Sequence, residues 1–120
     1  MNRSQYKLFS TGTIASLTIP NRLVRSATWD ASILSSRQVT GEVLELYREL
    51  SLGGVGMIIT GGLPVYRERL PEEEADAQIR LYADLRVNGL AEMVEVVHQA
   101  RRECKIIAQL EVGFVDAGPS

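Results

Sequence analysis

The chain has 120 residues, of which 45% are hydrophobic and 23% are charged, as in a soluble globular protein, and this length allows at most one small domain. A net charge of −2 with both signs interspersed gives no electrostatic reason to expect nucleic acid or an anionic membrane as a partner, so we expect small molecules or copies of the chain itself. The single cysteine excludes an internal disulfide, and the N-terminal sequence MNRSQYKLFS lacks an apolar stretch for a signal peptide or a membrane span, so we expect a cytoplasmic protein.

The first predicted elements are extended. Residues 8–20 contain two short apolar runs around Thr11-Gly12-Thr13, which is typical of a small hairpin or an extended lead-in. After Pro20-Asn21, residues 22–28 form the first predicted core strand.

A helix is predicted next. Thr40 is a suitable N-cap, and Glu42 lies in the first turn, where the helix dipole favours negative charge. Gly53 and Gly54 end the helix. Its apolar face, predicted to pack on a sheet, consists of Val43, Leu46, Tyr47 and Leu50.

The second half of the chain repeats this order. Residues 55–59 are a nearly continuous apolar run, typical of a strand covered on both faces. A long irregular stretch, 61–87, follows, and its acidic run Glu72–Glu74 is either a solvated loop or part of a lid. Asn88-Gly89 opens a second helix, and residues 106–110 form a third strand. The apolar stripe of this helix contains Leu90, Met93, Val94 and Val97.

Alternating strands and helices predict an α/β fold with parallel strands and right-handed crossovers. Two architectures fit, an open doubly wound sheet and a (β/α)8 barrel. A dinucleotide-binding sheet requires a G-x-G-x-x-G pattern after its first strand, but residues 27–30 read Ala-Thr-Trp-Asp. A barrel requires roughly 200 residues, so this chain would supply about three of its strands.

Three segments carry a resemblance to a known family. LFSTGTIASLTIPNRLVRSATWD, GGVGMIIT and LAEMVEVVHQARRECKIIAQL, in this order and at this spacing, resemble the N-terminal part of the old yellow enzyme family, the FMN-dependent NADH:flavin oxidoreductases. The resemblance runs from Leu8 to Leu110. It implies that residues 1–120 are a single partial domain, the N-terminal segment, with about three β/α units and a preceding hairpin, of a TIM barrel that binds FMN at the carboxyl ends of its strands.

The resemblance assigns Gly62 to the flavin site. In the family the end of the second strand passes close to the isoalloxazine ring, where a side chain would collide with the flavin. Gly61 and Gly62 occupy this position, and Gly62 is the better candidate. The alternative is that the two glycines only turn the chain.

Gln109 is the most specific candidate residue. It lies near the end of an apolar strand, where a buried amide requires a partner. A primary amide presents a donor beside an acceptor, which matches the pyrimidine edge of a flavin, and the family places a glutamine there. The alternative is that neighbouring backbone groups satisfy the Gln109 amide.

The end of the first strand contributes backbone groups in the family. Ser26, Ala27 and Thr28 match this stretch, although many relatives have proline in place of Ala27. Relatives also have a threonine or cysteine where this chain has Trp29, and an indole cannot replace a hydroxyl. Either Thr28 takes that role or the flavin is tuned differently, and Trp29 either lines the substrate pocket or packs in the core.

The sequence departs from the family after Gln109. Relatives often read Gln-Leu-x-His-x-Gly-Arg, whereas this chain reads QLEVGF. The family's substrate-binding pair, flavin-contacting arginine and phosphate-binding loops would follow Ser120, and nothing here resembles a P-loop. Catalytic residues are therefore not assigned, and we expect the 120-residue chain alone to hold FMN weakly and to be inactive.

Two further residues, His98 and Cys104, have reactive side chains to which we assign no function. His98, on the second helix, has no Cys, Asp or His partner nearby in the sequence, so we expect a structural residue and no metal site. Cys104 lies between Arg102 and Lys105, where positive charge can lower a thiol pKa, but no partner base is evident.

Three hypotheses about function follow. In the first, the chain is a segment of an oxidoreductase that passes hydride from NAD(P)H through FMN to an activated alkene or similar electrophile. In the second, it is a truncated, non-catalytic barrel fragment that associates through open sheet edges. A third, another phosphate-binding barrel enzyme, is disfavoured by Gln109 and the NRLVRSAT segment.

Overall fold

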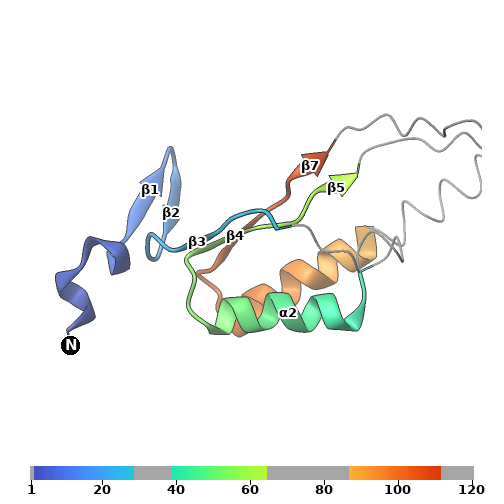
Figure 1. Cartoon of the computed structure of the whole chain (residues 1–120), viewed down its shortest axis with the longest axis horizontal. Helices are drawn as coiled ribbons and strands as arrows, with labels where there is room; N and C mark the ends of the chain where they lie inside the picture. The colour runs from blue at the N-terminus through green and yellow to red at the C-terminus, as the bar shows by residue number, and fades with distance from the viewer. Residues whose placement is uncertain (1, 29–38, 65–86, 112–120) are drawn as a thin grey trace, which may run out of the picture.

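The computed structural model describes residues 2–28, 39–64 and 87–111. Figure 1 shows an N-terminal hairpin beside an α/β unit. The elements are η1 (Arg3–Gln5), η2 (Lys7–Phe9), β1 (Gly12–Ile14), β2 (Leu17–Ile19), β3 (Val24–Arg25), α2 (Gly41–Leu52), β4 (Met57–Ile59), β5 (Leu63–Pro64), β6 (Lys105–Ile107) and β7 (Leu110–Glu111). Residues 87–100 are helical as well.

The predicted core strands form one parallel sheet. Its order is β3-β4-β6, so each strand lies beside the next core strand along the chain. The register pairs Arg25 with Ile58, and Ile58 with Ile106. This order of successive neighbours occurs in a (β/α)8 barrel and also in each half of a doubly wound sheet, in which the order reverses at a switch point.

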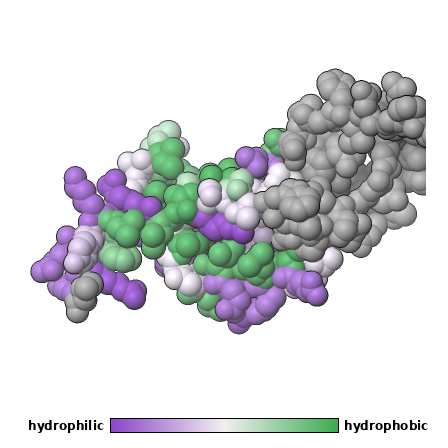
Figure 2. Space-filling view, viewed as in Figure 1, coloured by the Kyte–Doolittle hydropathy of each residue, from purple (hydrophilic) through white to green (hydrophobic). Residues whose placement is uncertain are grey.

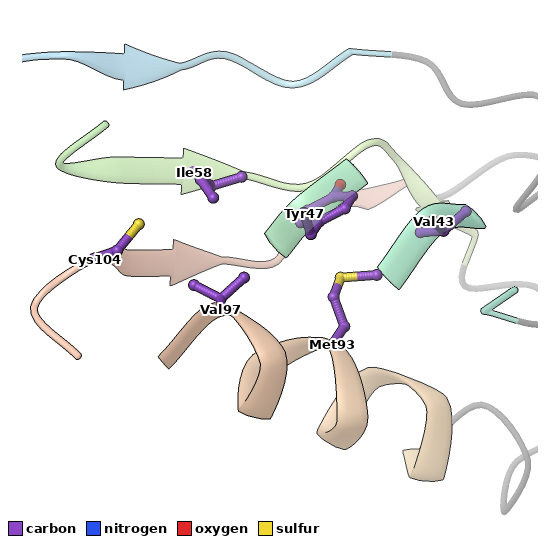
Figure 3. Close-up of a cluster of buried hydrophobic side chains, with 6 residues drawn as sticks. All are labelled: Val43, Tyr47, Ile58, Met93, Val97 and Cys104. Carbon is purple, nitrogen blue, oxygen red and sulfur yellow. The ribbon is translucent and has the colours of Figure 1, made fainter. Parts of the chain in front are cut away.

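The core lies between β4 and the two helices that follow β3 and β4 in the chain. Val43 and Tyr47 of α2 and Met93 and Val97 of the helix at 87–100 are each at most 1% exposed. They meet Ile58 of β4, which is fully buried, as Figure 3 shows. Both helices therefore cover the same face of the sheet, which is the face to which the predicted apolar stripes point.

The ends of α2 agree with the prediction. Thr40 is the N-cap, and its hydroxyl accepts a hydrogen bond from the Val43 N–H at 3.4 Å. The helix ends at Leu52, and Gly54 follows with a φ of +98°, a left-handed conformation that favours glycine.

The N-terminal hairpin is present, but its turn lies further along the chain than the motif Thr11-Gly12-Thr13. Strand β1 begins at Gly12 itself, and β1 pairs antiparallel with β2 through a turn at Ala15, whose φ is +50°. The N-terminal segment exposes several large side chains, and Figure 2 shows apolar surface near the hairpin. These side chains are Tyr6, Leu8, Phe9 and Ile14.

Several boundaries differ from the sequence prediction. The first two core strands are shorter than predicted, because β3 covers Val24–Arg25 of 22–28 and β4 covers Met57–Ile59 of 55–59. The third strand, expected over 106–110, is divided into β6 and β7, and the stretch expected to be irregular from residue 61 contains β5. Strands β5 and β7 pair in parallel, with Leu63 opposite Leu110. Trp29 and Glu72–Glu74 lie outside the described residues, so the predictions for them stay predictions. Among the described residues, no helix is long and apolar enough to cross a membrane.

Candidate functional site

The segments predicted to bind flavin follow the carboxyl ends of three parallel strands. Residues 26–28 follow β3, residues 60–62 follow β4, and residues 108–109 follow β6. Because the strands are parallel neighbours, these segments emerge at the same edge of the sheet. This edge is where α/β proteins usually bind ligands.

A bulge separates β4 from β5 at this edge. Ile59 pairs with Ile107, but Leu63 pairs with Leu110, so four steps along one strand oppose three steps along the other. One extra residue therefore lies on the β4 side, between Ile59 and Leu63, where Gly61 and Gly62 stand. Gly61 and Gly62 lie in this part of the strand, which is displaced from the ladder.

The backbone of Gln109 forms hydrogen bonds with residues on both sides of this bulge. Its N–H donates to the Thr60 hydroxyl at 3.0 Å, and its carbonyl accepts from the Leu63 N–H at 2.8 Å. In a regular parallel ladder these partners would be two residues apart on the neighbouring strand, whereas here they are three apart. The Gln109 backbone thus joins the two strands across the bulge.

Two buried hydroxyl groups support the bulge. The Gly61 N–H donates to the phenolic oxygen of Tyr47 at 3.1 Å, and Tyr47 is 1% exposed. Thr60 is 2% exposed, and in addition to its hydroxyl contact its N–H donates to the Ile107 carbonyl at 2.9 Å. Sequence reasoning missed both roles. The available signals were a phenol on an apolar helix face and a threonine that directly follows an apolar strand.

The side chain of Gln109 is exposed, so the expectation that its amide is buried is wrong. The physical reason is that β6 ends at Ile107, and Gln109 stands beyond the covered part of the sheet. Its hydrogen bonds within the described residues are those of its backbone. Gly62 is half-buried beside it, and Gly61 is buried.

The end of β3 is less closely tied to this arrangement. Ser26 and Thr28 are exposed, Ala27 is half-buried, and the Thr28 hydroxyl donates to the Ser26 carbonyl at 3.2 Å. Within the described residues, no hydrogen bond joins this segment to Gly62 or Gln109. The structure thus bonds the Gln109 backbone to Thr60 and Leu63, on either side of Gly62, and relates Ser26, Ala27 and Thr28 to these residues only by the edge that they share.

The other two candidates lie outside this edge. His98 is exposed on the helix at 87–100. Cys104 is fully buried directly before β6, and this burial raises the pKa of its thiol. The nearby positive charge of Lys105 lowers the pKa as expected, but burial outweighs it. In the described part of the chain, no group of three or more His, Cys, Asp or Glu residues could hold a metal ion.

Comparisons with known proteins identify the fold. No family model matches the sequence, and no curated protein matches it. The structure is similar to that of a variant of NCR from Zymomonas mobilis, with 23% sequence identity and a TM-score of 0.56. The likeness covers 88% of this chain and 32% of that chain, so this chain spans about a third of the length of that protein. At this identity the likeness shows the fold alone, which is an α/β arrangement found within a TIM barrel.

Proposed function

We propose that this chain is the N-terminal segment of an FMN-dependent oxidoreductase of the old yellow enzyme type, with the flavin ring at the carboxyl ends of β3, β4 and β6. The observation that carries the proposal is that the Gln109 backbone bonds to residues on both sides of Gly62, namely the Thr60 hydroxyl and the Leu63 N–H. The sequence resemblance assigned Gly62 and Gln109 to one flavin site, although they are far apart in the chain. The likeness to part of a larger barrel supports the fold that the proposal requires.

The chemistry of this edge fits a flavin ring. The exposed Gln109 amide offers a donor and an acceptor to the pyrimidine edge of the ring. Gly62 presents backbone without a side chain, so a flat ring can approach it closely. Ser26, Ala27 and Thr28 would contribute backbone groups from the neighbouring strand. Bound FMN would supply hydride transfer from NAD(P)H to a small electrophile such as an activated alkene.

The test is a titration of flavin fluorescence with the purified chain, using riboflavin and FMN in parallel. We expect weak binding of both, with similar dissociation constants, because the proposed contacts are to the ring and the sequence has no recognisable phosphate loop. The Gln109→Leu variant should bind roughly three- to tenfold more weakly, because it loses the amide contacts. Gly62→Val should bind more weakly still, because its side chain would occupy the space of the ring.

Gln99→Leu is the matched control. Gln99 is also an exposed glutamine, and its amide donates to Glu95 at 2.9 Å on the helix that leads into β6, near the opposite end of the strands. This variant should bind riboflavin as the unmodified chain does. Equal binding by the Gln109→Leu, Gly62→Val and unmodified chains, or no binding by the unmodified chain, would contradict the proposed function.

A second candidate function is association through the sheet edges. Within the described residues, β3 and β6 each pair with β4 alone, and they expose Val24 (42%) and Ile107 (39%). Unpaired strand edges and exposed apolar side chains favour pairing with another chain. Size-exclusion chromatography with light scattering should then show a dimer or larger assembly, and a monomer at high concentration would exclude this candidate.

A further inference from the structure

We infer that Tyr47 and Thr60 are positioning residues for the flavin site, and that they act by holding the bulge in which Gly62 and the Gln109 backbone lie. This inference rests on the proposed function. Neither side chain needs to touch the ligand. Each binds a backbone group of the segment that would touch it.

The packing of the core requires the ring of Tyr47 but does not require its hydroxyl group. The ring fills the core between α2 and β4, as Figure 3 shows, and a phenylalanine would fill nearly the same volume. The additional oxygen reaches the Gly61 N–H at 3.1 Å. Gly61 belongs to the displaced part of the strand, so its N–H lacks a regular ladder position. A buried N–H without a partner is costly, and the phenol therefore favours the bulged conformation.

The Thr60 hydroxyl acts on the opposite strand. It accepts the Gln109 N–H at 3.0 Å, in the place that the Thr60 carbonyl would take in a regular ladder. The side-chain contact therefore sets the position of the Gln109 backbone, and the Gln109 carbonyl in turn receives the Leu63 N–H. These hydrogen bonds hold the chain before and after the bulge to the neighbouring strand. Loss of either hydroxyl should therefore let Gly62 and Gln109 move relative to each other.

The test measures riboflavin dissociation constants for four variants at a temperature at which circular dichroism shows each of them folded. Tyr47→Phe and Thr60→Val each remove one hydroxyl and keep the shape of the side chain. Both should raise the dissociation constant by roughly three- to tenfold. Thr60→Ser keeps the hydroxyl and should bind as the unmodified chain does.

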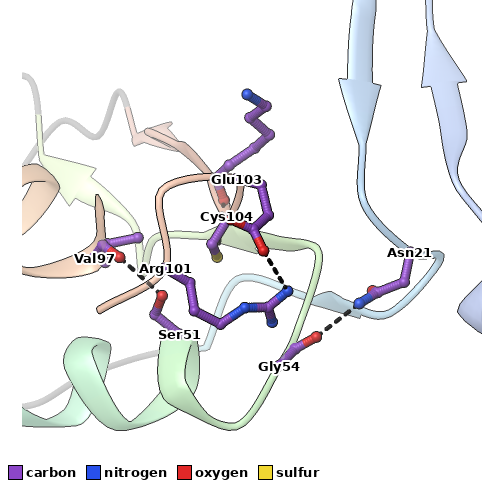
Figure 4. A network of polar contacts seen from close by, with 8 residues as sticks. Asn21, Ser51, Gly54, Val97, Arg101, Glu103 and Cys104 are labelled. Carbon is purple, nitrogen blue, oxygen red and sulfur yellow. Dashed lines mark hydrogen bonds and ion pairs between the residues drawn. The ribbon is translucent and has the colours of Figure 1, made fainter. Parts of the chain in front are cut away.

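Ser51→Ala separates positioning from a general loss of stability. Ser51 is also fully buried, and its hydroxyl donates to the Val97 carbonyl at 2.9 Å, as Figure 4 shows, and not to a residue of the bulge. This variant should lower the melting temperature and leave the dissociation constant unchanged. Amide hydrogen exchange at Gly61 should accelerate in Tyr47→Phe and not in Ser51→Ala.

Each outcome has one meaning. Unchanged riboflavin binding in Tyr47→Phe and Thr60→Val would overturn the inference and leave the proposed function in place. Equal weakening in Ser51→Ala, or failure of Thr60→Ser to restore binding, would also overturn it, because loosening of the fold would then explain the loss. If the unmodified chain binds no riboflavin, the proposed function fails and the inference fails with it.

Discussion

Asn21 and Gly56 are in such close contact that a Cβ atom on Gly56 would lie 2.6 Å from the Asn21 carbonyl oxygen and 2.7 Å from its Oδ1. The Asn21 side chain also donates to the Gly54 carbonyl at 2.7 Å, as Figure 4 shows, and accepts from the Leu23 N–H at 3.0 Å. This contact joins the start of β3 to the turn before β4. It fixes the amino ends of the same strands whose carboxyl ends form the proposed site.

Gly56→Ala should therefore destabilise the fold by about 1–3 kcal/mol, because the new methyl group would meet backbone atoms that cannot move independently of the strand. Urea unfolding followed by circular dichroism measures the change. Gly41→Ala is the control, because a Cβ there has no atom within 4 Å, and this variant should be neutral or slightly stabilising. Equal stability of the two variants would contradict the close contact.

Asn21→Ala tests the same connection from the other side. It removes the hydrogen bonds to Gly54 and Leu23, and we expect a loss of about 1–3 kcal/mol, since the partly buried groups of the turn lose their partners. Asn88→Ala, at an exposed position in the helix at 87–100, is the control and should change stability by less than about 0.5 kcal/mol. If both asparagine variants unfold at the same urea concentration, the connection contributes nothing.

Ile58→Ala tests the core. Ile58 is fully buried between α2 and the helix at 87–100, so its truncation should cost about 2–5 kcal/mol through lost burial and a cavity. Leu52→Ala, at a position that is 47% exposed, should cost much less. The same unfolding experiment compares the two, and a similar loss in both would show that the helices do not cover β4 as described.

Cys104 should not react with a thiol reagent such as Ellman's reagent until the chain unfolds. Its thiol is fully buried, and its pKa is raised, mainly by that burial, above the ordinary value of 9.0. The folded chain therefore holds this proton more tightly than the unfolded chain does. The resulting stability is fully present below about pH 9 and is lost as the pH rises through the folded pKa.

The pH dependence is measured as the difference between the unmodified chain and Cys104→Ala, because lysines and tyrosines also titrate in alkaline solution. The unmodified chain should lose more stability above pH 9 than the variant does. Rapid labelling of the folded chain, or identical pH profiles of the two proteins, would contradict the burial of this thiol.

Local signals in the sequence predicted much of the fold. Thr40 caps α2 and Gly54 follows its end, because capping depends on the nearest few residues. The helical periodicity also predicted which residues enter the core. Leu46 and Val94, however, remain 39% and 38% exposed, because the three strands of this sheet in the described residues do not cover the sides of the helices.

The bulge could not be predicted from the sequence. It depends on the register between β4–β5 and β6–β7, which are distant in the chain, and register is set by packing and by long-range contacts, among which are the hydrogen bonds of the Thr60 and Tyr47 hydroxyl groups. For the same reason the sequence predicted one strand over 106–110, where the structure has two. Gly62 and Gln109 were identified through family resemblance, and their proximity became evident only in the structure.

The most direct test of the central claim is a two-dimensional ¹⁵N NMR titration of the labelled chain with riboflavin. We predict that the amide signals of Thr28, Gly62 and Gln109 shift together and saturate at a common dissociation constant, while signals from the hairpin and from the amino end of the sheet, such as Gly56, stay in place. Shifts confined to other residues, or no shifts at millimolar riboflavin, would contradict a flavin site at the carboxyl ends of these strands.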